Sequence, residues 1–262
     1  MQFNNFYFRF DGLNSRDKNL VLVTVDGLSQ NNQNGLQFGV NKTIAYSQNS
    51  NDISSIDIKP LTIPVTIMKL DGYGIPMPYE PYELDEICRW LFQDEFKPFI
   101  SFDDTSIVSY VMFTQGNNFK NSANEGCLNL TMTLSDGYAY THQKVEYVRV
   151  TGSKVIEVIN NSNFQRFVYP DIEFELIGDN TNLSIKNLDF GESMDFTGLE
   201  KNEHIYCYND GLKYVESKVD KTRILNTKFN DKWIKLHYGK NRIKVTGDCI
   251  IKIITQCPIA LN

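Results

Sequence analysis

The sequence lacks long hydrophobic segments. Its 262 residues contain no run of the roughly 18 apolar residues that a membrane-spanning helix needs. Residues 1–5 (MQFNN) also lack the basic and then apolar layout of a signal peptide. We therefore expect a protein that is made in a cytoplasm and does not insert into a membrane.

Cysteine and histidine are scarce and poorly spaced for chemistry. The five cysteines are an odd number without a C-x-x-C pair, which favours free thiols over a disulfide framework or a zinc ribbon. The three histidines, His142, His204 and His237, lie far apart in the sequence and form no H-E-x-x-H motif. Surface or lightly buried histidines are the better interpretation than metal ligands or general bases.

Motifs for nucleophilic or phosphate chemistry are missing as well. No G-x-S-x-G, G-x-G-x-x-G or G-x-x-x-x-G-K-[ST] segment occurs. The adjacent acids Asp103 and Asp104 could suggest a carboxylate pair, but Thr105 and Ser106 follow them, which favours a turn. We predict no catalytic residues, no bound metal and no cofactor.

Charge is distributed unevenly along the chain. The formal net charge is −6, which argues against a protein that holds nucleic acid through its phosphates. Residues 1–145 carry 10 Lys and Arg against 16 Asp and Glu, whereas residues 146–262 carry 16 of each. This asymmetry suits two modules in different surroundings, although chance and solubility are the simpler explanation.

The pattern of apolar residues predicts a mainly β protein with one helix. Leu84, Ile87, Cys88, Leu91 and Phe92 fall at helical spacing, and acidic residues crowd the start of this segment. Alternating apolar residues predict strands at 19–25, 56–67, 99–102, 107–113 and 127–134. Two prolines at 60 and 64 predict that the second of these strands lies at a sheet edge or contains a bulge.

The second half is predicted to contain only short strands and turns. The expected strands are 155–159, 172–176, 183–185, 204–208, 233–236, 243–245 and 249–254, with a turn at 239–241. Such spacing is typical of an antiparallel sandwich. We expect a first domain at 1–145 and a second domain at 146–262.

Three segments, in order, resemble the distal tail proteins of siphophages. The central one reads YELDEICRWLF (82–92), EFKPFISFDD (95–104) and SYVMF (109–113), and a second reads LNLTMTL (128–134) and SDGYAY (135–140). Gly137 stands where that family usually has proline. A weaker match covers 170–176 and 233–247, which look like the family's C-terminal module, itself similar to galectins and carbohydrate-binding modules.

The resemblance implies a structural protein of the virion, assembled in the host cytoplasm. Its first domain would be a tail-tube-like β-sandwich with a flanking helix, and six copies would form a ring. The ring would join the tail tube protein to the tail-tip, baseplate or receptor-binding protein and leave a channel through which DNA passes without specific binding. The second domain would be a galectin-like β-sandwich outside the ring.

Several residues are candidates for interaction. The polar segment 27–43 is a candidate hairpin for the ring interface or lumen, with Asn31, Asn32, Asn34 and Gly35 at its centre. Arg89 and Trp90 are candidates for helix packing or for an interface. Trp233, Tyr206 and Tyr208 are candidates for a glycan-stacking platform, with structural packing as the favoured role of Trp233.

Three rival functions remain open. The main alternative is a carbohydrate-binding adhesin that contacts the host cell surface. A cell-wall hydrolase is disfavoured because the sequence offers no acid, base and nucleophile together. The tail-tube protein itself is disfavoured by the second domain.

Overall fold

The structure is a computed structural model that describes residues 4–24, 38–44, 51–58, 62–115, 126–163, 167–208 and 213–260. The chain divides into two compact units. Unit 1 comprises Met1–Tyr140 and Ile259–Asn262, and unit 2 comprises Thr141–Pro258. The expected boundary was 145/146, whereas the chain changes unit at 140/141 and returns to unit 1 at its C-terminal end.

Unit 1 is built on one ten-stranded sheet with the strand order β1-β4-β7-β10-β9-β8-β2-β3, to which β11 and β21 are added beside β9. The strands are β1 (Asn4–Phe6), β2 (Phe8–Phe10), β3 (Leu13–Asn14), β4 (Leu20–Thr24), β7 (Thr62–Lys69), β8 (Lys97–Ser101), β9 (Ile107–Gln115), β10 (Cys127–Leu134), β11 (Tyr138–Thr141) and β21 (Pro258–Ala260). A short 3-10 helix, η1 (Ser15–Lys18), joins β3 to β4.

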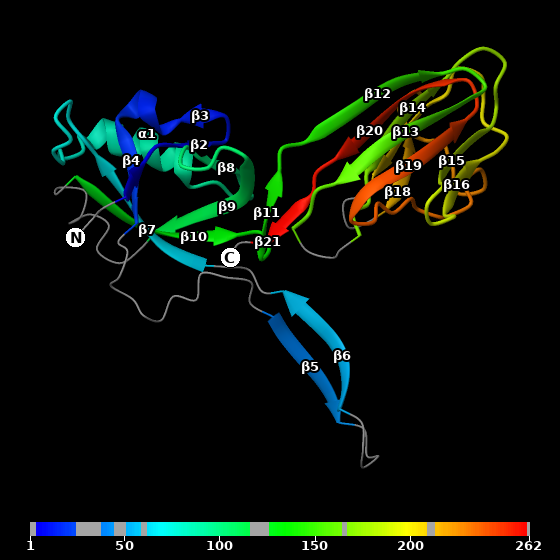
Figure 1. Cartoon of the computed structure of the whole chain (residues 1–262). Helices are drawn as coiled ribbons and strands as arrows, with labels where there is room; N and C mark the ends of the chain where they lie inside the picture. The colour runs from blue at the N-terminus through cyan, green and yellow to red at the C-terminus, as the bar shows by residue number, and fades with distance from the viewer. Residues whose placement is uncertain are drawn as a thin grey trace. The chain divides into compact units, whose positions relative to one another are not determined.

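The expected strand 56–67 is wrong, because two strands occupy this region. β6 (Asn51–Ile58) pairs with β5 (Phe38–Ile44) in a separate two-stranded sheet, which Figure 1 draws as its own ribbon. β7 lies in the middle of the large sheet between β4 and β10, so it is not an edge strand. Pro64 pairs with Thr131 of β10 but lies outside the register with β4, which covers residues 66–69 of β7. Its missing N–H is therefore tolerated.

The predicted helix is α1 (Pro81–Leu91), the one α-helix among the described residues. Glu80 and Glu83 form a capping box, in which the Glu80 N–H donates to the Glu83 carboxylate at 3.0 Å, and Pro81 occupies the first helical position. At the other end the Gln93 side-chain amide donates to the carbonyls of Arg89 and Trp90 at 3.0 and 2.9 Å. Both ends of the helix are thus satisfied by local side chains.

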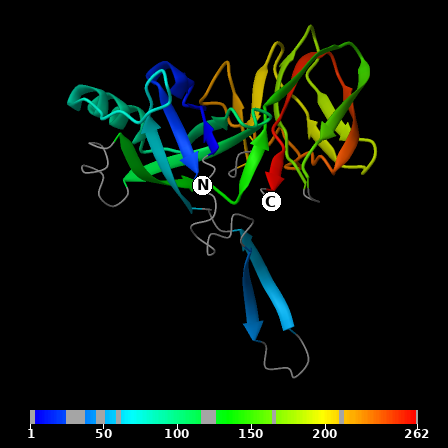
Figure 2. The same cartoon turned by 60° about the vertical axis from the view of Figure 1, so that its left-hand side comes forward.

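A single apolar core joins α1 to the sheet of unit 1. Figures 1 and 2 show the helix against one side of the strands. The core combines Ile87 and Leu91 of α1 with Phe10 of β2 and Leu22 of β4, which lie towards opposite ends of the strand order. Because both ends of the sheet contribute to one core, the sheet must curve around it.

Unit 2 is a sandwich of two antiparallel sheets (Figure 2). The five-stranded sheet has the order β12-β20-β14-β17-β18, and the four-stranded sheet has the order β13-β19-β15-β16. The strands are β12 (Lys144–Val150), β13 (Ser153–Asn160), β14 (Asp171–Leu176), β15 (Leu183–Asn187), β16 (Ser193–Phe196), β17 (His204–Tyr208), β18 (Tyr214–Ser217), β19 (Gly239–Thr246) and β20 (Cys249–Thr255).

The core of unit 2 lies between these sheets and is largely aliphatic. Alternate residues of each strand point inward, such as Ile205 and Cys207 of β17 and Ile243 and Val245 of β19. The expected mainly β fold, with one α-helix among the described residues and a β-sandwich as the second domain, is confirmed. Within the described ranges, no helix has the length and apolar character needed to cross a membrane.

Two local expectations for unit 2 are wrong. Residues 233–236 do not form a strand, because the only pairing there is an isolated bridge from Leu236 to Val168. The expected turn at 239–241 instead begins β19, since Gly239 at φ +84° turns the chain directly into the strand. The side chain of Asn241 then donates to the carbonyls of His237 and Gly239, so a residue typical of turns stabilises the strand start.

Candidate functional site

The candidate ring or lumen residues Asn31, Asn32, Asn34 and Gly35 lie outside the described residues. The two strands that follow these residues are described: β5 and β6 pair antiparallel from Phe38↔Ile58 to Ile44↔Asn51, with a bulge between Asn41 and Lys42. Among the described residues, neither strand pairs with a third. Residues 38–43 of the candidate segment 27–43 therefore lie in β5 and pair with β6, so the described hairpin joins 38–44 to 51–58, later in the chain than the predicted turn at Asn34 and Gly35.

Trp90 and Arg89, adjacent on α1, have different environments. Trp90 is only 6% exposed, and its indole N–H donates to the Phe10 carbonyl at 3.0 Å. Its ring stacks on Phe8 with 5.7 Å between centroids and 4° between planes. Arg89 is exposed, and its carbonyl accepts the hydrogen bond from the Gln93 side-chain amide. In unit 1 as described, Trp90 is thus a core residue, and Arg89 alone of the two is open to a partner.

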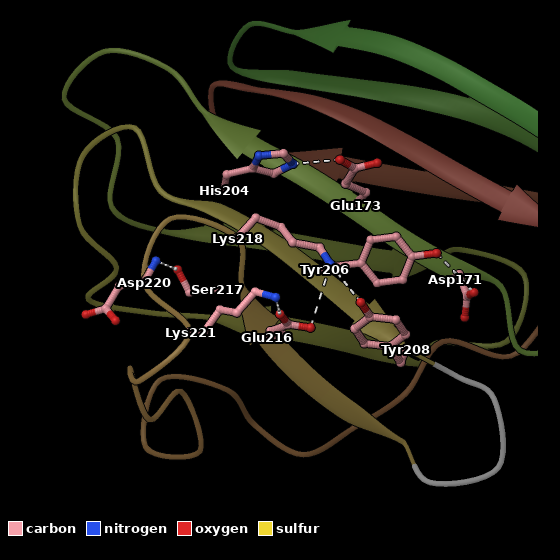
Figure 3. Close-up of polar contacts among 10 residues, drawn as sticks. All are labelled: Asp171, Glu173, His204, Tyr206, Tyr208, Glu216, Ser217, Lys218, Asp220 and Lys221. Atoms are coloured by element: carbon pink, nitrogen blue, oxygen red, sulfur yellow. Dashed lines mark hydrogen bonds and ion pairs between the residues drawn. The ribbon is translucent and has the colours of Figure 1, made fainter.

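Tyr206 and Tyr208 do lie together, on the outer face of the five-stranded sheet (Figure 3). Their ring centroids are 4.3 Å apart, and Tyr208 stacks on Tyr214 of β18 at the same distance with 16° between planes. Residues 206 and 208 point outward because the alternate residues of β17 fill the core. We call Tyr206, Tyr208 and Tyr214 the tyrosine ladder.

Paired charges surround the tyrosine ladder. Glu173 of β14 accepts from Lys252 at 2.8 Å and lies 2.7 Å from the His204 imidazole. Burial alone would raise the pKa of Glu173, but the hydrogen bonds from Lys252 and His204 hold it below its ordinary value. The Lys218 ammonium donates to the Tyr208 hydroxyl at 2.7 Å, which raises the pKa of Lys218.

The hydroxyls of the ladder are also engaged. Tyr206 donates to the Asp171 carboxylate at 3.2 Å, and burial together with this acid raises the pKa of Tyr206 well above its usual range. Sequence reasoning found the tyrosines but missed Asp171, Glu173 and Lys218. These charged residues reach the ladder through the cross-strand register, in which Tyr206 pairs with Glu173 on one side and with Glu216 on the other. The sequence alone does not reveal this register.

Trp233 does not join the tyrosine ladder. It is half-buried against the aliphatic core, and its ring meets Phe229 edge-on at 5.3 Å. Phe229 in turn stacks on Phe196 of β16, at 4.9 Å, in the other sheet. Of the three candidate glycan residues, Trp233 therefore packs against the core, whereas Tyr206 and Tyr208 lie on the outer face of the five-stranded sheet.

The remaining polar groups do not converge on a reactive centre. The Asp104 carboxylate accepts from the hydroxyl and the N–H of Ser106, which lowers the pKa of Asp104 and makes this segment a turn. Burial raises the pKa of the thiols of Cys88, Cys207 and Cys249, that of Cys249 to about 12. Over the described part of the chain, no cluster of three or more His, Cys, Asp or Glu side chains is arranged to hold a metal ion.

The described fold thus consists of two β units, the first with a packed helix and the second a sandwich. Residues 3–136 match the family model described as the phage tail protein N-terminal domain, and residues 138–255 match that of the phage tail C-terminal domain. The chain belongs to this family of phage tail proteins. A phage tail protein is a component of the virion, and family and fold are those of a structural protein.

Individual proteins that resemble this chain are more specific than the family model. The chain is 25% identical over 258 residues to the SPbeta prophage-derived uncharacterized protein YomH of Bacillus subtilis strain 168, covering 94% of this chain and 95% of that protein. Its fold is similar to that of the SPP1 Dit protein, described as a paradigm of the hub adsorption apparatus in phages that infect Gram-positive bacteria. That match has a TM-score of 0.62 at 16% identity, over 96% of this chain and 98% of the other.

A chain of the phage P2 baseplate in its activated conformation with Ca is also similar, with a TM-score of 0.51 at 12% identity over 96% of this chain and 98% of that one. The phage tail family that the sequence motifs indicated is confirmed, and the expected likeness to a distal tail protein is confirmed at the level of the fold.

Proposed function

We propose that the protein is the distal tail protein of a phage with a long, non-contractile tail. Unit 1 of six copies closes into a ring that continues the tail tube. The opposite face of the ring receives the tail-tip or receptor-binding protein, and the central channel passes DNA. The observation that carries this proposal is the similarity to a distal tail protein across both units, 96% of the chain, and not across one alone.

The separate hairpin supports self-association. A two-stranded hairpin is marginally stable alone in water and gains most from a third strand or a packing surface. β5 and β6 pair only with each other among the described residues. A neighbouring copy in a closed ring would supply the missing partner to every hairpin at once.

The distribution of charge supports a channel for DNA. The whole excess of six negative charges lies in residues 1–145. Phosphate contacts made by Lys and Arg add affinity for DNA, and a conduit must avoid such affinity. An acidic unit 1 around the channel and a neutral unit 2 outside it satisfy this requirement.

Native mass spectrometry and negative-stain imaging of the full chain test the proposal. We expect closed rings of six copies that cap the end of purified tail tubes. A chain that stays monomeric at high concentration and does not join tube ends would refute it. A glycan-binding monomer would instead favour the adhesin, and an open tube would favour the tail-tube protein.

The hairpin has its own test. Replacing residues 25–61 by a short Gly-Ser linker joins Thr24 of β4 to Thr62 of β7, which are neighbouring antiparallel strands. We expect a folded monomer, with a circular dichroism spectrum that retains the helix and the sheet. The role of the hairpin in ring closure is wrong if this variant still forms rings.

A further inference from the structure

The segment between β7 and α1 exposes several apolar side chains. Tyr73 is 93% exposed, Ile75 60% and Met77 40%. Asp71 is the only charged residue in the whole stretch 70–79. Apolar side chains gathered on one exposed segment mark an interaction site, whereas single exposed ones are ordinary. We call Tyr73, Ile75 and Met77 the apolar loop.

Hydrogen bonds fix the tip of the apolar loop. The Asp71 carboxylate accepts from the backbone N–H groups of Tyr73 and Ile75, each at 2.8 Å. The Asp71 N–H donates to the Ile75 carbonyl at 2.9 Å, and the Gly74 N–H donates to the Asp71 carbonyl at 3.1 Å. Gly74 has φ +81°, which glycine adopts without strain. The one charge of the segment is therefore used within the loop itself.

The base of the apolar loop is fixed against the start of β10. The Met77 N–H donates to the Lys69 carbonyl at 2.9 Å, and the Lys69 N–H donates to the Gly126 carbonyl at 3.1 Å. A Cβ atom at position 126 would collide with the Met77 backbone, so glycine permits this close approach. A loop fixed at both tip and base loses little conformational entropy when it binds.

The apolar loop and the β5–β6 sheet are attached at opposite ends of the same two strands. Lys69, the last residue of β7, pairs with Leu20, the first residue of β4, and the loop follows directly (Figure 1). The segment 25–61, which contains β5 and β6, leaves the end of β4 and enters the start of β7. A head-to-tail ring needs two different surfaces on each copy. These two features provide such a pair.

We propose that the apolar loop packs against the β5–β6 sheet of the neighbouring copy, with Tyr73 as the central anchor. This inference rests on ring formation by unit 1 and identifies the contact between adjacent copies. In the described part of the chain, β5 and β6 have no third strand, and a two-stranded sheet gains stability from a packing surface. The loop supplies that surface and is itself covered, once at every junction of the ring.

Other occupants fit the apolar loop less well. Residues 70–79 contain no Lys or Arg, so they offer no side-chain charge to the phosphates of DNA. The centres of protein interfaces are depleted of charge and enriched in tyrosine, which matches this segment. A tube or tip protein on the loop would leave the β5–β6 sheet of every copy without a packing surface. A second copy of the chain satisfies both requirements with one contact.

Ring assembly of the full chain over a concentration series tests the proposal by native mass spectrometry. Tyr73→Ser/Ile75→Ser should raise the midpoint concentration of assembly about a hundredfold, because two anchoring side chains are lost. Tyr238→Ser is the matched control, since Tyr238 is a tyrosine of unit 2 that is 64% exposed, and it should assemble as the unmodified chain does. Thermal unfolding of the dilute monomers should be the same for all three, because the replaced side chains are exposed.

Asp71 tests whether the loop must be held in place. Asp71→Ala keeps every exposed apolar side chain but removes the acceptor for two N–H groups, so the midpoint should rise about tenfold. Asp71→Asn retains a side-chain oxygen that can accept both bonds, and it should assemble at nearly the unmodified concentration. Equal assembly by Asp71→Ala and the unmodified chain would contradict the role of a fixed loop.

Photocrosslinking identifies what covers the loop. With p-benzoylphenylalanine in place of Tyr73, a mixture of isotopically labelled and unlabelled copies should give crosslinks between copies, in peptides that contain β5 or β6. Crosslinks only to other segments, or rings formed by Tyr73→Ser/Ile75→Ser at the unmodified concentration, would overturn this contact and leave the ring itself intact. An unmodified chain that stays monomeric would refute the ring, and this contact with it.

Discussion

Unit 1 and unit 2 use aromatic side chains in opposite ways. In unit 1, Phe8, Phe10 and Trp90 form the centre of the core, where they fasten α1 to the sheet. The core of unit 2 is filled by Ile, Val and Leu, with Phe174 and Phe196 as its fully buried aromatic rings. Its tyrosines and several further rings are left for the outer faces.

The difference shows that the role of an aromatic residue can be judged only together with the packing needs of the nearby core. An antiparallel sandwich with enough aliphatic residues has no packing use for rings on its outer strands. Tyr206, Tyr208 and Tyr214 contact one another on such an outer face, outside the aliphatic core. Trp90, in contrast, lies between α1 and the sheet of unit 1 and is explained by packing.

Replacing Trp90 by alanine is the strongest test of this contrast. We expect the free energy of unfolding of unit 1 to fall by about 3–5 kcal/mol, because a large buried ring is removed. The indole hydrogen bond to Phe10 is lost with it. Urea denaturation followed by circular dichroism measures the change. Arg89→Ala is the neighbouring control and should shift the value by less than about 0.5 kcal/mol. Equal effects of the two variants would contradict the core assignment of Trp90.

Trp233→Ala should have an intermediate effect within unit 2. The ring is half-buried, so we expect a loss of about 2 kcal/mol rather than the full cost of a buried tryptophan. Hydrogen exchange of the β16 and β19 amides reports the change locally. Unchanged stability would contradict the packing role of Trp233.

Glu173→Gln tests the charged contacts beside the tyrosine ladder through the pH dependence of the stability of unit 2. The folded-state pKa of Glu173 is lowered, so its ionised form stabilises unit 2 above the ordinary pKa of 4.5. That contribution disappears as the pH falls through the lowered folded value. Thermal unfolding from pH 7 to pH 3 should therefore show a shallower decline for the variant, which starts about 1 kcal/mol less stable at pH 7. Parallel curves would show that the contacts to Lys252 and His204 do not matter.

Tyr208→Phe should have the smallest effect. It removes the hydroxyl that accepts from Lys218 and keeps the stacked ring, so a change of about 0.5 kcal/mol is expected at this exposed site. Tyr208→Ala removes the ring as well and should cost more. Differential scanning calorimetry distinguishes the two. If both variants behave alike, the stacking of Tyr208 on Tyr206 and Tyr214 contributes nothing measurable.

Local patterns predicted some elements well. The spacing of Ile87 and Leu91, together with the acids at the start, correctly indicated α1. Alternation correctly indicated β17 at 204–208 and nearly all of β20. In each case the signal lies within one segment and reflects one buried face.

The errors arose where long-range pairing decides the structure. Pro64 suggested an edge, yet β7 is central and the proline lies where pairing with β4 has ended. The apolar alternation at 233–236 predicted a strand, but residues 234 and 236 are buried without a neighbouring strand that continues the pairing. Tyr206 was found without Glu173 and Lys218, because register is not visible in sequence.

The last strand, β21, has a mechanical consequence. It pairs with β11, while the Thr141 N–H donates to the Cys257 carbonyl at 2.8 Å just beyond that pairing. Unit 2 is therefore an insertion within unit 1, entered and left through two adjacent chain segments. A pull on unit 2 reaches unit 1 through the covalent link at β11, while the hydrogen bonds between β21 and β11 hold the returning end of the chain beside that link. The same arrangement would let a different inserted domain replace unit 2 with few changes to unit 1.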